Sequence, residues 1–283
     1  MRGIGCFAGL GKLRVCRRVW AWLVWLLLAA CATPGERIAQ LAGEAGLQQQ
    51  IIEGEGFRHV VLFRRDEASG RRLHVYLDHD GRPWIGGTRV ASDPSPRVPL
   101  ALALMVQDPA DAIYLGRPCH FGAGGQAGCH PLVWTHARYG EAVVASMAAA
   151  ISRWMARTGH AELVLIGYSG GGTLATLLAA RLPQTRGLIS VAANLDVDAW
   201  ARLHRYSPLA GSLDPAAQDG LDSRVLQHHH VGGRDRNVPP ELLTRFVARQ
   251  AAARVVAHPD FDHICCWVEA WPGLLDLFNS FAP

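Results

Sequence analysis

One stretch near the middle of the chain constrains its fold more than any other. It reads Leu163-Val-Leu-Ile-Gly-Tyr-Ser-Gly-Gly-Gly-Thr-Leu-Ala-Thr-Leu-Leu-Ala-Ala180. Its apolar first part has strand character, and the small residues that follow Ser169 have helical character. A strand that turns into a helix this abruptly forces Ser169 into a positive φ, and side chains two residues before or after it would clash. Gly167 and Gly171 therefore fit the turn, which presents the serine hydroxyl above the edge of a sheet.

The pattern Gly-x-Ser-x-Gly is a weak signal by itself, because a chain with 30 glycines can contain it by chance. The alternative interpretation is a glycine-rich turn with a solvated serine. A serine hydroxyl is a poor nucleophile at neutral pH, so a catalytic Ser169 needs a nearby base that an acid orients. The rest of the chain offers candidates for both.

Asp235 is the candidate acid. It lies in Val231-Gly-Gly-Arg-Asp-Arg-Asn-Val-Pro-Pro240, after an expected strand and before a helix that we expect near Pro239. Asp196, which follows the preceding strand, is the main rival, and Asp198 is a weaker one. The alternative role for Asp235 is that of a turn or helix-capping residue.

His263 is the candidate base. It lies in Pro259-Asp-Phe-Asp-His-Ile264 and is the only one of 13 histidines between the last expected strand and the last expected helix. The alternative is an ordinary loop histidine. At His228-His229-His230 we expect packing and hydrogen bonding rather than metal binding, since side chains alternate between the faces of a strand.

Taken together, residues 73 to 283 resemble the α/β-hydrolase superfamily. The resemblance rests on the nucleophile elbow at Ser169, on Gly-x-x-Asp followed by Val-Pro at Asp235, and on His263. It implies an α/β fold with a mainly parallel central sheet and helices on both faces. It also implies an oxyanion hole made by the N–H of Gly170 and one from loop 78–84. Gly81 or Arg82 could donate there, whereas Pro83 lacks an N–H; the alternative for this loop is a tight Asp-Gly turn.

Hydrophobic periodicity and turn residues predict the order of the elements. The expected helices cover residues 36–47, 99–106, 140–158, 241–252 and 266–281, besides the one after Ser169. The expected strands cover residues 48–52, 58–64, 73–77, 112–115, 187–193, 223–231 and 254–257, besides the one before Ser169. Their alternation in the second half favours parallel strands, whose carboxyl ends carry the active site.

The N-terminus has the pattern of a targeting segment. Five basic residues precede an apolar run over 19–30, which is too short for a comfortable membrane span. Leu28-Ala-Ala-Cys31 resembles a bacterial lipobox, which implies a signal peptide over 1–30 and a lipid-modified Cys31. Ala32 favours the outer membrane, facing the periplasm of the cell envelope. The alternatives are an ordinary secretory signal and an uncleaved anchor.

Residues 31–283 are expected to form one domain, since a chain that is 49 % hydrophobic can build one large core. The formal charge is +4, but the five basic residues of the leader account for all of it and leave −1 elsewhere. No basic face remains for nucleic acid. The sequence does not define an oligomeric state.

Cysteine usage agrees with an oxidising compartment. Cys119 and Cys129 bracket a glycine-rich loop and are expected to form a disulfide. Metal binding with His120 and His130 is the alternative. We expect two buried thiols at Cys265 and Cys266, because vicinal disulfides are rare.

These features predict an exported serine hydrolase of carboxylic esters or related acyl compounds, small or lipidic, that needs no metal or organic cofactor. The alternatives are an amide or peptide hydrolase, a thioesterase, and a non-catalytic envelope lipoprotein that kept the fold. Residues 196–221 leave room for a small cap but indicate no large lid; its wall candidates are Trp200, His204 and Tyr206.

Overall fold

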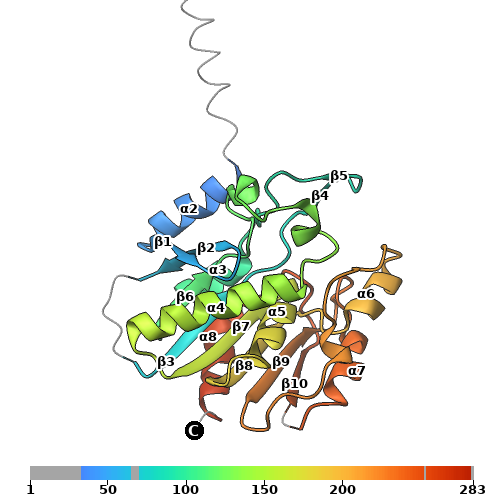
Figure 1. Cartoon of the computed structure of the whole chain (residues 1–283). Coiled ribbons are helices and arrows are strands. Elements are labelled where there is room, and N and C mark those ends of the chain that lie inside the picture. Colours follow the sequence, from blue (N-terminus) through green and yellow to red (C-terminus); the bar gives the residue numbers. More distant parts are fainter. Residues whose placement is uncertain (1–32, 65–69, 252, 282–283) are drawn as a thin grey trace, which may run out of the picture. The chain divides into compact units, whose positions relative to one another are not determined.

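The computed structural model describes residues 33–64, 70–251 and 253–281 (Figure 1). The expected signal segment and Cys31 lie outside these residues. From Pro34 onward the chain forms one compact unit. Within the described ranges, no helix is both long and apolar enough to cross a membrane.

An eight-stranded sheet organises this unit, in the order β1-β2-β6-β3-β7-β8-β9-β10. From β6 to β10 all neighbouring strands are parallel, while β1 and β2 add an antiparallel edge. The strands are β1 (Gln48–Glu53), β2 (Arg58–Phe63), β3 (Arg72–Leu77), β6 (Ala112–Leu115), β7 (Glu162–Tyr168), β8 (Thr185–Val191), β9 (Leu226–Gly232) and β10 (Ala253–His258). A separate hairpin joins β4 (Trp84–Ile85) to β5 (Arg89–Val90).

Helices cover both faces of the sheet. The α-helices are α2 (Pro34–Glu44), α3 (Leu100–Val106), α4 (Glu141–Thr158), α5 (Gly170–Ala179), α6 (Val197–Leu203), α7 (Thr244–Val247) and α8 (Trp267–Asn279). Short 3₁₀ turns occur at η1 (Ala123–Gly125), η2 (Pro131–Trp134), η3 (Pro215–Ala217) and η4 (Pro240–Leu243). The expected α/β fold with a mainly parallel sheet is confirmed.

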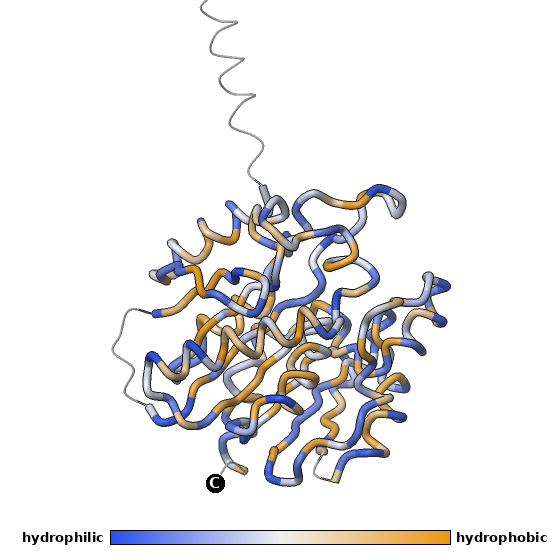
Figure 2. The backbone as a smooth tube through the Cα atoms, viewed as in Figure 1, coloured by the Kyte–Doolittle hydropathy of each residue, from blue (hydrophilic) through white to orange (hydrophobic). Residues whose placement is uncertain are grey.

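Alternation along β7 explains the two layers. Leu163 and Leu165 pack with α4 and α5 in one core, whereas Val164 and Ile166 pack with α3 and α8 in the other. Successive side chains of a strand point to opposite faces, so a strand buried on both sides reads as one continuous apolar run. Figure 2 shows hydrophobic residues along the strands and helices inside the molecule and hydrophilic residues at many outer turns. This double burial fixes the end of β7, where Ser169 follows.

The helix expected over 241–252 is wrong in length. The chain forms η4 and the single turn of α7, which ends at Val247. Beyond it, Arg249 donates to the carbonyl of Gln218, and the Gln250 side chain accepts from the N–H of Leu221. The backbone N–H groups of Arg249 and Gln250 bond three residues back, to Phe246 and Val247, so the segment ends in turns while these side chains bind a distant segment.

The cysteines form two pairs among the described residues. Cys119 and Cys129 are bonded at an S–S distance of 2.03 Å and close the glycine-rich loop as expected. Cys265 and Cys266 are also bonded to each other, and Cys265 is exposed. The expectation of two buried thiols is therefore wrong: these residues lie in the surface loop before α8 rather than inside the helix, where packing would bury them.

Candidate active site

The sharp turn after β7 holds Ser169 at φ 54° and ψ −123°. A Cβ at Gly167 would lie 2.3 Å from the carbonyl oxygen of Gly171, and one at Gly171 would lie 2.0 Å from that of Leu77. Neither distance is tolerable for a real side chain, so both positions require glycine. A positive φ is costly for serine, and such strain persists only where the surroundings enforce it. The elbow is thus built as the sequence predicted.

Three side chains meet at this turn. The Nε2 atom of His263 lies 3.1 Å from the Oγ of Ser169, and its Nδ1 lies 2.7 Å from Oδ2 of Asp235. The other oxygen of Asp235 accepts the N–H groups of Asn237 and Val238, both at 2.8 Å. Asp235 is only 3 % exposed, so these donors stabilise its charge in place of water. A carboxylate on Nδ1 favours the tautomer that leaves a lone pair on Nε2, the atom facing Ser169.

The ring of Tyr168 packs against the ring of His263. The two rings lie 5.3 Å apart, and the Tyr168 hydroxyl donates to the carbonyl oxygen of His263. Burial raises the pKa of Tyr168, so its hydroxyl stays protonated as a donor. This contact fixes the position of the imidazole relative to the elbow, because Tyr168 is the residue just before Ser169.

The rival acids have other structural roles. Asp196 caps α6 by accepting the N–H of Ala199, and it forms an ion pair with Arg245. Asp198 is exposed in the first turn of the same helix. Neither is the carboxylate that contacts His263.

The three consecutive histidines divide between the faces of β9. His229 accepts or donates a hydrogen bond with Ser190 and packs on Phe246. His228 and His230 lie on the opposite face, where His230 contacts His258. Burial lowers the pKa of His229 and of His230 to about 3, so both are neutral packing residues.

Asn237 is a member of the site that sequence reasoning missed. Its Nδ2 lies 3.0 Å from Nε2 of His263, the atom that also contacts Ser169. When Nδ1 donates to Asp235, Nε2 has one lone pair, and two donors compete for it. The only signal in the sequence was its place two residues after Asp235.

Replacing Asn237 with alanine is therefore expected to raise kcat/KM for a water-soluble ester. The variant frees the Nε2 lone pair for Ser169 and keeps the backbone N–H that binds Asp235. One neutral hydrogen bond is worth about 1 kcal/mol, which corresponds to a gain of about fivefold. Steady-state assays at neutral pH would measure it, with Arg236→Ala in the same loop as the control. A fall in kcat/KM would instead show that Asn237 positions the imidazole.

The loop after β3 lies beside the elbow, but its N–H groups are not free in the way that we expected. The N–H of Gly81 donates to Nδ1 of His79 at 3.1 Å, and the N–H of Arg82 donates to the carbonyl of Pro94 at 2.8 Å. Both groups are occupied, so the assignment of Gly81 and Arg82 to an oxyanion hole does not fit the structure. The tight turn uses these N–H groups to hold itself against the loop around Pro94.

The backbone N–H of Gly170, the first residue of α5, has no hydrogen-bond partner among the described residues, as expected. The N–H of Asp80 has none among them either. The first N–H groups of a helix have no intrahelical acceptor and carry partial positive charge. The Asp80 side chain lies close by, because a Cβ at Gly170 would come within 2.0 Å of its Oδ1.

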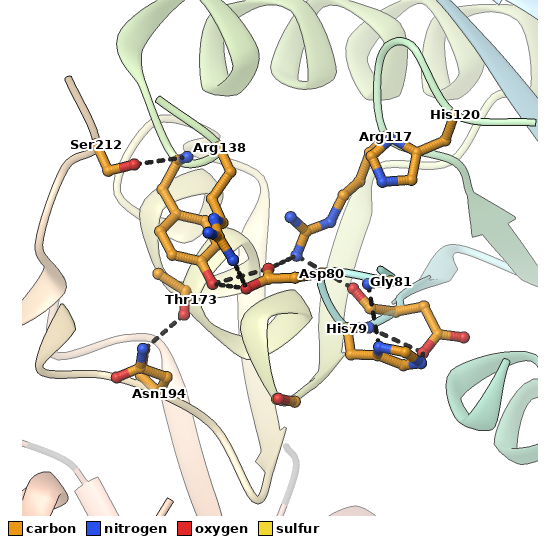
Figure 3. A network of polar contacts seen from close by, with 12 residues as sticks. His79, Asp80, Gly81, Arg117, His120, Arg138, Thr173, Asn194 and Ser212 are labelled. Atoms are coloured by element: carbon orange, nitrogen blue, oxygen red, sulfur yellow. Dashed lines mark hydrogen bonds and ion pairs between the residues drawn. The ribbon is translucent and has the colours of Figure 1, made fainter. Parts of the chain in front are cut away.

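Asp80 is the centre of a buried charge network (Figure 3). Arg117 and Arg138 each contact one of its carboxylate oxygens at 2.8 Å, and the Tyr139 hydroxyl donates to both. Burial alone would raise the pKa of Asp80, but the two guanidinium groups and these hydrogen bonds hold the pKa below its usual range. The two arginines and Tyr139 thus hold the Asp80 carboxylate in place.

The wall candidates after β8 lie near the site. The Trp200 and His204 rings both hydrogen-bond to the carbonyl oxygen of Asn237, and Tyr206 stacks on His204 at 5.3 Å. Asn237 connects this aromatic group to the site, because its carbonyl oxygen binds Trp200 and His204 and its side chain contacts His263. Between β8 and β9 the only helices are α6 and η3, in keeping with a small cap.

Known structures share this fold. An esterase from Pyrococcus furiosus matches with a TM-score of 0.60 at 10 % identity, covering 84 % of this chain and 92 % of that one. An α/β serine hydrolase without a lid from Xanthomonas campestris gives 0.53 at 15 % identity, covering 84 % and 95 %. A hormone-sensitive lipase from a metagenome library gives 0.57 at 15 % identity, covering 93 % and 98 %.

At these identities the likeness establishes the fold, which is the α/β-hydrolase fold. No protein-family model and no curated protein sequence matches the chain. Neighbours of this fold include esterases and serine hydrolases, but a fold hosts many activities. The activity has to be argued from the site.

Proposed function

We propose that this protein is a serine hydrolase that cleaves carboxylic esters or related acyl compounds through an acyl-enzyme. The observation that carries the proposal is the hydrogen-bonded series Ser169–His263–Asp235 at a strained elbow. The strain has no structural benefit of its own, and residues held in such conformations cluster at functional sites. The esterases among the structural neighbours support the same chemistry.

The proposed reaction begins with attack of the Ser169 Oγ on the ester carbonyl while Nε2 of His263 takes the serine proton. Asp235 holds the imidazole and stabilises its charged form. His263 then protonates the departing alcohol, which leaves an acyl group on Ser169. Water attacks this acyl group with His263 again as base, and the free acid is released.

The negative oxygen of the tetrahedral intermediates would bind the N–H groups of Gly170 and Asp80. Preorganised donors of this kind stabilise the transition state by about 3–4 kcal/mol each. Neither donor has to give up another partner among the described residues.

A fluorophosphonate probe tests the proposal directly. It should label the full-length protein at Ser169, and mass spectrometry should place the adduct on the peptide that contains residue 169. Labelling should disappear in Ser169→Ala and fall sharply in His263→Ala. A folded protein that takes up no probe would overturn the proposal and favour a non-catalytic lipoprotein.

We also propose that the chain is exported and anchored in the cell envelope through a lipid on Cys31. Two disulfides among the described residues support an oxidising compartment. Metabolic labelling with a fatty-acid analogue should mark the protein, and Cys31→Ser should abolish the mark. Uptake of label by the Cys31→Ser variant would overturn the lipid anchor.

A further inference from the structure

The beginning of the described chain is fastened to one particular group of loops. The N–H of Gly35, in the first turn of α2, donates to Asp93 Oδ2 at 3.2 Å. A Cβ at Gly35 would lie 2.7 Å from the Cα of Phe121, so helix and loop pack without a gap. Ser95 joins the two loops, because its hydroxyl donates to Asp93 and accepts the N–H of Phe121.

These loops in turn support the wall of the active site. The carbonyl oxygen of Pro94 accepts the N–H of Arg82, and a Cβ at Gly81 would lie 1.8 Å from it. Gly81 follows Asp80, which touches the first residue of α5. The start of α2 therefore lies at the same edge of the sheet as Ser169, the edge at the carboxyl ends of the parallel strands. In Figure 1 the start of α2 and the β4–β5 hairpin both lie at the top of the molecule.

The few residues between position 31 and α2 limit how far the start of α2 can lie from the N-terminal segment. Only four residue steps separate position 31 from Gly35, and a fully extended chain spans about 14 Å over that length. The apolar run 19–30 comes immediately before. Given the membrane anchor proposed above, this short connection keeps the edge that bears Ser169 near the bilayer.

Large apolar side chains are exposed at this edge. Ile264, next to His263, is 66 % exposed, and Tyr206, on the aromatic wall, is 56 % exposed. Val98 is 69 % exposed, and its carbonyl oxygen contacts Nε2 of His79, whose ring packs on Tyr168. These three residues come from three separate loops around the catalytic serine. Exposed apolar groups at one edge indicate a surface that meets something less polar than water.

Exposed arginines accompany them. Arg82, Arg97, Arg205 and Arg236 are exposed, lie in loops at the same edge of the sheet, and form no ion pair with any residue that the structure describes. Elsewhere Arg71 pairs with Glu162 and Arg224 pairs with Asp222, whereas Arg153 and Arg254 are exposed and form no ion pair with a described residue. Unpaired guanidinium groups around apolar side chains complement anionic lipid headgroups above acyl chains.

We propose that these seven residues form a docking surface for a phospholipid bilayer with anionic headgroups. The surface consists of Val98, Tyr206 and Ile264 together with Arg82, Arg97, Arg205 and Arg236. It turns Ser169 toward the membrane that holds the N-terminus. This inference rests on the hydrolase proposed above. Its substrate class is then an ester-bearing lipid that Ser169 takes from the bilayer surface.

Photolabelling tests the docking surface without requiring activity. The full-length Ser169→Ala protein is reconstituted into vesicles of phosphatidylcholine and phosphatidylglycerol that contain a diazirine phospholipid. Illumination should place adducts on the peptides with Val98, Tyr206 and Ile264, and not on those with Ile51 and Val255, which are comparably exposed on the two edge strands. Equal labelling of both groups, or labelling confined to residues before Pro34, would overturn the proposal.

The charge contribution has its own control. The variants Arg97→Gln and Arg236→Gln should each lower the adduct yield on the docking surface by up to about fivefold when phosphatidylglycerol is present. Arg224→Gln, at the start of β9 and so at the opposite edge of the sheet, should have no effect. A yield that is insensitive to Arg97, Arg236 and phosphatidylglycerol would overturn the role of the arginines.

Kinetics separate this proposal from the hydrolase proposal. Wild-type protein in vesicles should cleave both a short water-soluble ester and a diacylglycerol ester in the bilayer. Val98→Ser with Ile264→Ser should reduce the second activity at least tenfold more than the first, whereas Ile51→Ser with Val255→Ser should change neither. Docking without cleavage of any ester would overturn the hydrolase, and cleavage of the soluble ester without docking would overturn the surface.

Discussion

The Ser169→Ala variant is expected to lose about 10⁵–10⁶-fold in kcat for an ester substrate while it remains folded. The loss follows from removal of the nucleophile, after which His263 has no hydroxyl to activate. Triad members act as a unit, so their single losses do not add. His263→Ala should cost about as much as Ser169→Ala, and the double variant should cost no more than either.

Asp235→Asn belongs to the same experiment. It keeps the shape of the side chain but removes the charge that selects the His263 tautomer, and we expect a loss of about 10⁴-fold. Single-turnover and steady-state assays would measure these effects, with thermal unfolding as the check on folding. Losses that multiply in the Ser169→Ala, His263→Ala double variant would show that the two residues act independently and would contradict a shared proton transfer.

The sequence was sufficient to predict that Ser169, Asp235 and His263 lie together, because each one lies in the segment that follows a parallel strand. The end of a parallel strand is a local feature, and all such ends meet at one edge of the sheet. Local pattern therefore placed three residues that are far apart in the chain. The geometry of the elbow was equally local, since Gly167 and Gly171 avoid clashes within a few residues of Ser169.

The other parts of the site depend on contacts that no local pattern reveals. Which N–H of the loop after β3 is free depends on the carbonyl of Pro94 and on the ring of His79, both of which take up the expected donors. The position of the Asp80 carboxylate depends on its hydrogen bond with Arg138, which lies 58 residues further along the chain. The order of the strands also depends on long-range contacts. In the sheet β6 lies between β2 and β3, which the order of the strands along the chain does not reveal.

Replacing Asp80 with alanine is expected to lower the free energy of unfolding by about 3–5 kcal/mol. The variant leaves Arg117 and Arg138, both more than nine-tenths buried, without the carboxylate that neutralises them. Chemical denaturation at pH 7 would measure the loss. Arg138→Gln in the Asp80→Ala background should restore part of the stability, because it removes one uncompensated charge. A double variant that is less stable than Asp80→Ala alone would contradict this account.

The stability of the wild type and that of the Asp80→Ala variant should respond differently to pH. The pKa of Asp80 is lower in the folded state than the value near 4 of an unfolded aspartate, so its contribution is fully present above pH 4 and is lost as the pH falls toward the folded-state pKa. The stability gap between wild type and Asp80→Ala should therefore be constant from pH 7 to 5 and narrow by about 1 kcal/mol at pH 3. A gap that does not change with pH would mean that the Asp80 carboxylate is not held ionised by Arg117 and Arg138.

Activity gives an independent readout: if Asp80 positions its own N–H beside Gly170, Asp80→Asn should lower kcat by about 10²-fold and leave KM nearly unchanged, because an oxyanion donor acts on the transition state and not on the bound ester.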